Sequence, residues 1–110
     1  MLHWSDFEKV EMRVGTIIAV HDFPKAKKPA YQLTIDFGRQ LGIKKSSAQI
    51  TVRYSKDELL GKQIVAVVNF PDKQIADFMS ECLVLGSVGE ENDIVLLTTD
   101  KKVENGLRIG

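Results

Sequence analysis

Residues 63–87, QIVAVVNFPDKQIADFMSECLVLGS, decide the fold of this chain. They contain two apolar runs, 64–70 and 82–85, joined by a short segment that begins at Pro71. The first run does not alternate between apolar and polar residues, as a strand with one solvated face does. A strand that is apolar on both faces has to be covered on both faces. We therefore expect residues 64–70 to form a strand inside the core of the domain.

The joining segment keeps large apolar side chains among turn-forming and charged residues: Phe70, Ile75, Phe78 and Met79. Loops rarely carry such side chains unless they pack against something or bind something. In a structural interpretation, these residues close one end of a barrel or pack in a dimer interface. In a functional interpretation, they form an apolar surface, rimmed by Asp72, Lys73 and Asp77, that binds an unfolded peptide. The sequence leaves both interpretations open.

The rest of the chain is predicted to form short strands and two short helices. Strands are expected at residues 11–21, 31–37, 45–54, 64–70, 82–85 and 94–98. Ser5 is expected to cap a helix over residues 6–10, and Ser55 and Glu58 have the spacing of a capping box for a second helix that stops at Gly61. Three strands, a helix and two strands is the order of the five-stranded OB-fold barrel. We therefore expect an all-β, five-stranded OB-fold barrel with short helices, in one domain of residues 1–110.

Two of these strands carry specific expectations about their faces. In residues 11–21 we place four side chains on one face, and Gly15 is the expected site of a sharp bend; the four are Met12, Val14, Ile18 and Val20. In residues 45–54 the alternation predicts that four side chains face inward: Ala48, Ile50, Val52 and Tyr54. Asn105-Gly106 predicts a tight turn near the C-terminus.

Composition excludes some classes of protein and weighs against others. The chain has 15 Lys and Arg and 15 Asp and Glu, so its formal net charge is zero. Nucleic-acid-binding modules are usually basic, so neutrality counts mildly against nucleic acid as the main partner. Residues 1–12 do not resemble a secretory leader, and no apolar run is long enough to span a bilayer. The lone Cys82 is expected to be a buried thiol, and the chain a cytoplasmic protein.

Patterns that would indicate catalysis or a cofactor are missing. His3 and His21 are isolated and have no metal-ligand spacing with other His or Cys residues. Gly38 and Gly42 do not belong to a phosphate-binding glycine motif. Cys82 has no evident base beside it in the sequence pattern. We therefore expect a non-enzyme without a cofactor.

Five stretches of the chain resemble the tRNA-binding-domain family of dimeric OB-fold proteins: VEMRVGTI (10–17), YQLTIDFG (31–38), SSAQI (46–50), VAVVNF (65–70) and SECLVLGS (80–87). The resemblance covers essentially the whole chain in the same order. It implies a homodimer, in which the N- and C-terminal extensions would form the interface. Within the family, the resemblance is to export-related chaperones. This implies unfolded, export-bound preproteins as ligands and a translocation ATPase as a further partner.

The resemblance also implies an alternative function, structure-specific tRNA binding. Relatives that bind tRNA tend to carry several basic residues after the Asn that corresponds to Asn69, whereas residues 71–77 here contain one, Lys73. Each lost phosphate contact lowers the salt slope of binding by about 0.9. We therefore favour a peptide site made of Phe70, Ile75, Phe78 and Met79. The alternative RNA site consists of Lys25, Lys27, Lys28, Lys73 and Ser80.

Overall fold

The computed structural model describes all residues from 1 to 110. Its helices are α1 (Trp4–Lys9) and α2 (Lys56–Leu59), and η1 (Glu90–Asn92) is a 3-10 turn. Its strands are β1 (Met12–Asp22), β2 (Tyr31–Asp36), β3 (Ile43–Ala48), β4 (Gln63–Val67), β5 (Lys73–Ile75), β6 (Phe78–Ser80), β7 (Leu83–Val84), β8 (Gly86–Val88) and β9 (Ile94–Leu96). No helix has the length and apolar character needed to cross a membrane.

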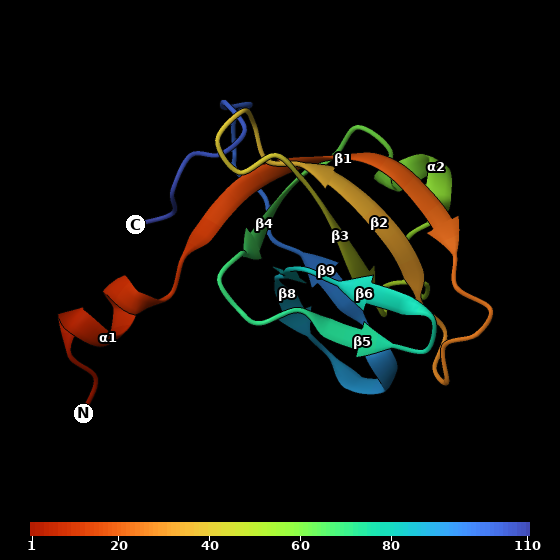
Figure 1. Cartoon of the computed structure of the whole chain (residues 1–110). Coiled ribbons are helices and arrows are strands. Elements are labelled where there is room, and N and C mark those ends of the chain that lie inside the picture. The colour runs from red at the N-terminus through yellow and green to blue at the C-terminus, as the bar shows by residue number, and fades with distance from the viewer.

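Five strands form one antiparallel sheet in the order β3-β2-β1-β4-β7. The sheet curls into a nearly closed barrel, and α1 extends away from it at the N-terminal end (Figure 1). Two further pairs of strands, β5–β6 and β8–β9, form separate hairpins. The predicted all-β barrel of OB-fold type with short helices is confirmed. The hairpin β5–β6 occupies the segment that the sequence placed between two apolar strands.

The strand β4 lies in the core, as its apolar pattern predicted, but it ends at Val67. The predicted strand over 64–70 is therefore too long, and Phe70 is exposed. Ile64, Val65, Ala66 and Val67 are all buried. Ile64 and Ala66 belong to the central apolar cluster, which also contains Ile17, Leu33, Ile35, Phe37, Ala48, Ile50, Leu59, Cys82 and Leu96. Val65 and Val67 lie on the opposite face, where they pair in register with Val14 and Met12 of β1. Both faces of the strand are therefore covered.

The C-terminal segment extends the sheet along the first half of β1. The backbone N–H of Val14 donates to the carbonyl of Leu107 at 3.0 Å, and that of Ile109 donates to the carbonyl of Met12 at 2.9 Å. Asn105-Gly106 forms the predicted turn, with Gly106 in the left-handed region at φ 92°. Its Cβ would lie 2.6 Å from the carbonyl oxygen of Phe37, so a side chain has no room at this position.

The predicted faces of two strands need correction. The register of β1 against β2 shifts between Ile17 and Ala19. Ile17 is fully buried, whereas its neighbour Ile18 is 44% exposed on the other face. Gly15 lies before this irregularity. Its Cβ would approach Ile35 within 2.6 Å, so the missing side chain allows β1 to pack closely on β2. A bulge reverses the alternation after it, so Val20 packs against the core on the side of Ile17, three positions away. The prediction that Met12, Val14, Ile18 and Val20 share one face is therefore wrong.

The third strand is shorter than predicted. Tyr31, the first residue of β2, pairs with Ala48, so residues after Ala48 have no partner strand on that side. Ile50 is still buried and Tyr54 packs against the core, but Val52 is 63% exposed in a turn. The inward position predicted for Val52 is therefore wrong.

The helix caps match the sequence in one case and not in the other. The capping box of α2 is present, with the Glu58 N–H donating to Ser55 Oγ and the Ser55 N–H donating to Glu58 Oε1. In contrast, α1 begins at Trp4 and its N-cap is His3, whose N–H donates to Asp6 Oδ2 at 3.0 Å. The helix thus begins two residues earlier than predicted, and Ser5, the predicted cap, lies inside it.

The barrel closes along a seam, which we define as residues 45–47 of β3 facing residues 80–82. One backbone hydrogen bond crosses it, from the Glu81 N–H to the Lys45 carbonyl at 2.7 Å. Side chains make the others: Lys45 N–H donates to Glu81 Oε1 at 2.9 Å, Ser47 N–H to Ser80 Oγ at 3.1 Å, and Ser46 Oγ to the Cys82 carbonyl at 3.0 Å. Hydrogen bonds from side chains thus take the place of most of the backbone hydrogen bonds that two paired strands would form across the seam.

Ser80→Ala tests the seam. The substitution removes the acceptor of the Ser47 N–H in a largely buried position, and we expect it to lower the free energy of unfolding by about 1–2 kcal/mol. Chemical denaturation followed by circular dichroism measures this change. The matched control is Ser87→Ala on the exposed strand β8, for which we expect a change below about 0.5 kcal/mol. Equal stability of the two variants would contradict the structural role of Ser80.

Candidate functional site

The largest hollow in the structure is a groove of about 970 Å³ beside the seam. Three stretches of chain surround it: residues 47–50 at the end of β3, residues 70–75 leading into β5, and residues 82–86 around β7. Ser80, Val88, Asn92 and Ile94 complete it. Most of its lining side chains are apolar, and we refer to it as the groove.

Asn69 holds the first part of the groove wall in place. Its Oδ1 accepts from the Glu11 N–H at 3.0 Å, and its Nδ2 donates to the Lys9 carbonyl at 2.7 Å. This side chain ties the end of β4 to the segment between α1 and β1. Phe70, the next residue, is 55% exposed at the groove. An aromatic ring left this open to solvent at a fixed position is available to a ligand.

The hairpin β5–β6 is anchored from the other side by the loop between β1 and β2. The rings of Phe23 and Phe78 pack with their centroids 5.4 Å apart, and Phe23 is only 4% exposed. Lys25 forms an ion pair of 3.2 Å with Asp77 at the hairpin turn. The pair is exposed and contributes little stability by itself, so the aromatic contact is the main anchor.

The four residues of the predicted peptide site therefore occupy different places. Phe70 and Ile75 line the groove. Phe78 is partly buried against Phe23 and positions the hairpin. Met79 is 47% exposed on the hairpin and does not line the groove.

The five residues of the predicted RNA site are likewise divided. Lys73 and Ser80 line the groove, but Ser80 is 9% exposed and its hydroxyl accepts from Ser47 N–H in the seam. Lys25 is paired with Asp77. Lys27 and Lys28 are exposed in the loop and take part in no ion pair. The structure thus brings members of both predicted sites to one groove and leaves two lysines free outside it.

Sequence reasoning missed the side chains that line the far wall of the groove, Val84, Leu85 and Ile94. The sequence predicts one strand over residues 82–85 because this run is apolar throughout. Only Leu83 and Val84 form β7, and after Leu85 the chain enters β8 at Gly86, where a Cβ would lie 2.7 Å from the Val95 carbonyl oxygen. A glycine directly after so short an apolar run was the available signal that the strand is interrupted there and that another backbone approaches closely.

Two ionisable groups near the groove have shifted pKa values. Burial raises the pKa of the Cys82 thiol to about 11, so this thiol stays protonated at neutral pH and is a poor nucleophile. The hydrogen bond from Arg53 lowers the pKa of Asp93, next to the groove residue Ile94. Arg53 thereby neutralises Asp93. No group of three His, Cys, Asp or Glu side chains is arranged to hold a metal ion.

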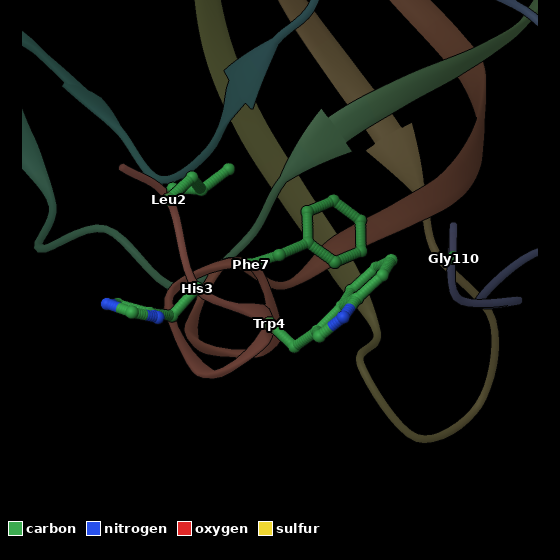
Figure 2. A pocket seen from close by; sticks show the side chains of 5 residues that line it. All are labelled: Leu2, His3, Trp4, Phe7 and Gly110. Atoms are coloured by element: carbon green, nitrogen blue, oxygen red, sulfur yellow. The ribbon is translucent and has the colours of Figure 1, made fainter.

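A second hollow lies between α1 and the C-terminus. Its volume is about 580 Å³, and it is lined by Leu2, His3, Trp4, Phe7 and Gly110. Trp4 and Phe7 point from the helix toward the side on which Gly110 lies (Figure 2). Trp4 is 84% exposed and Leu2 77%. These side chains form a second apolar surface, on the part of the chain that extends away from the barrel.

Comparison with known proteins identifies the family. Residues 12–108 match the family model described as a putative tRNA-binding domain. The chain is 35% identical over 106 residues to a methionine–tRNA ligase of Thermococcus onnurineus and 29% identical over 105 residues to that of Methanocaldococcus jannaschii. Each alignment covers 96% of this chain but only 14% and 16% of the ligase, respectively, so the chain spans about one seventh of the length of these relatives.

Two solved structures are similar over the whole chain. The chaperone CsaA from Bacillus anthracis is 50% identical with a TM-score of 0.95, covering 100% of this chain and 99% of that one. The CsaA chaperone protein from Picrophilus torridus is 54% identical with a TM-score of 0.93, covering 100% of both chains. The resemblance found in the sequence is thus confirmed, and the chain belongs to the tRNA-binding-domain family, with a structure like that of the CsaA chaperones.

Proposed function

We propose that this chain is a non-enzymatic, CsaA-like chaperone that binds unfolded, export-bound preproteins in the cytoplasm. The observation that carries the proposal is the groove, which combines an apolar lining with the half-exposed ring of Phe70. The similarity to two structures described as CsaA chaperones supports it. A translocation ATPase is a further proposed partner, on the same resemblance.

The groove suits polypeptide better than nucleic acid. An apolar side chain that moves from water into such a groove gains about 1.5–3 kcal/mol if fully buried, and unfolded chains expose many such side chains. RNA binding depends on neutralising phosphates, yet Lys73 is the one basic residue that lines the groove, and Asp72 lies beside it. Single-strand binding also uses stacked aromatic rings, and Phe70 is the one aromatic residue in the lining.

Charged substitutions in the groove test this function. We expect Phe70→Asp and Ile75→Asp each to reduce suppression of aggregation of an unfolded secretory precursor by about tenfold, since each removes apolar contact and adds a charge. Light scattering at a fixed ratio of chaperone to precursor measures the effect. Val52→Asp is the matched control, because Val52 is 63% exposed and lies outside the groove. If both groove variants suppress aggregation as well as the unmodified protein, the groove is not the site that binds the precursor. Phe78→Asp is less informative, because it also removes the contact with Phe23.

A second candidate function is structure-specific tRNA binding. The family match and the two unpaired, exposed lysines Lys27 and Lys28 favour it. RNA would contact Lys25, Lys27 and Lys28 in the loop between β1 and β2, together with Lys73 at the groove. Ser80 would contribute by holding the seam in place, since its hydroxyl accepts from the Ser47 N–H. The two activities involve partly different surfaces and need not exclude one another.

Reversing the loop charges tests tRNA binding. We expect Lys27→Glu with Lys28→Glu to weaken tRNA binding at least tenfold at low salt and to lower the salt slope by about two. The matched control is Lys101→Glu with Lys102→Glu, which makes the same change in net charge on the C-terminal segment. Filter binding between 50 and 200 mM salt gives both quantities. Weak binding of the unmodified protein at 50 mM salt, with a flat salt dependence, would exclude this function.

We also propose that the chain forms a homodimer through α1 and the C-terminal segment. Trp4 and Leu2 expose large apolar areas around the second hollow, and tryptophans often dominate interfaces. A twofold-symmetric contact would cover the same patch on both subunits. Sedimentation equilibrium at micromolar concentration should therefore give the mass of two chains, and Trp4→Glu should shift it toward one. A stable monomer of the unmodified protein would refute the dimer.

A further inference from the structure

The strand β5 presents an unpaired edge to the groove. It pairs with β6 and with no other strand. Residues 70–75 line the groove consecutively, whereas β6 contributes only Ser80. Side chains alternate between the two faces of a strand, so a run of consecutive lining residues means that the edge of the strand, and not one of its faces, borders the groove.

The register of the hairpin determines which backbone groups lie on that edge. A two-residue turn, Ala76-Asp77, joins Ile75 to Phe78, and these two residues pair, as do Lys73 and Ser80. Residues that flank a two-residue turn bond to one another, and the next pair along does not. The N–H and C=O of Gln74 therefore point away from β6, into the groove. An added strand would find a donor and an acceptor there.

The charges around the groove are unevenly balanced. Arg53 neutralises Asp93, and Lys73 stands next to Asp72. Glu90 and Glu91 are exposed and form no ion pair, and they directly precede the groove residue Asn92. This end of the groove is therefore acidic. It attracts basic groups and repels phosphates.

We propose that the groove binds an extended segment of apolar residues that carries lysine or arginine, added as a strand along the edge of β5. This deepens the chaperone function proposed above and rests on it. The apolar lining takes the side chains of the segment, Gln74 bonds its backbone, and Glu90 and Glu91 attract its basic residues. Recognition through the backbone is tolerant of sequence, while the acidic end distinguishes basic from acidic segments.

The selectivity is tested with two labelled peptides that share one apolar core and differ in their flanks, lysine in one and glutamate in the other. Fluorescence anisotropy with the full chain should give about five- to tenfold tighter binding of the lysine peptide at 50 mM salt, and a ratio near one at 500 mM. Glu90→Gln with Glu91→Gln should remove most of this preference. The control, Asp100→Asn with Glu104→Gln, makes the same change in net charge and should keep it.

Backbone recognition is tested with N-methylated versions of the lysine peptide. Methylating three central amides removes donors that an added strand needs, and we expect at least tenfold weaker binding. Methylating three terminal amides should change binding less than twofold. Equal effects of central and terminal methylation would overturn the strand-addition part of the proposal.

The outcomes separate this inference from the function on which it rests. If wild-type protein binds lysine and glutamate peptides equally and still suppresses aggregation, the chaperone function stands and the selectivity is wrong. If the preference persists in the Glu90 and Glu91 variant, the acidic end of the groove is not its source and the proposal fails. If neither peptide binds and aggregation is not suppressed, the chaperone function itself is rejected.

Discussion

Closure of the barrel by side chains is the constraint on which the rest of the structure depends. Across the seam, Ser80 and Glu81 supply the acceptors for the backbone N–H groups of Ser47 and Lys45. The hairpin β5–β6 pairs with no further strand. Ser47 and Ser80, whose hydrogen bond crosses the seam, also line the groove. Stability and the candidate site thus depend on the same few residues.

The anchors of the hairpin explain why similar residues have different roles. Phe70 and Phe78 are both aromatic and lie eight positions apart, yet Phe70 is open to solvent while Phe78 packs on Phe23. Lys25 is held by Asp77, whereas Lys27 and Lys28 remain unpaired. The family match alone points to RNA. The apolar groove with its acidic end favours a polypeptide, and the free lysines of the loop are where RNA binding would reside.

The fold was predictable from the sequence to the extent that its signals are local. The apolar run of β4 predicted a buried strand, and the spacing of Ser55 and Glu58 predicted a capped helix; both are present. The errors arose where a distant partner decides the outcome: the bulge at Ile18 follows from pairing with β2, and Val52 is exposed because β2 begins at Tyr31. The candidate site was found in part for the same reason. An apolar run such as 82–85 looks alike in sequence whether it fills a core or lines a groove.

The central claim is that the groove, and not the basic loop, holds an unfolded polypeptide. Backbone amide chemical shifts, followed by NMR while an unfolded polypeptide is titrated into the protein, test it most directly. The account predicts the largest changes at residues 72–75, at 82–86 and at Ile94. Changes confined to the loop 23–29 or to α1, with the groove amides unmoved, would contradict it.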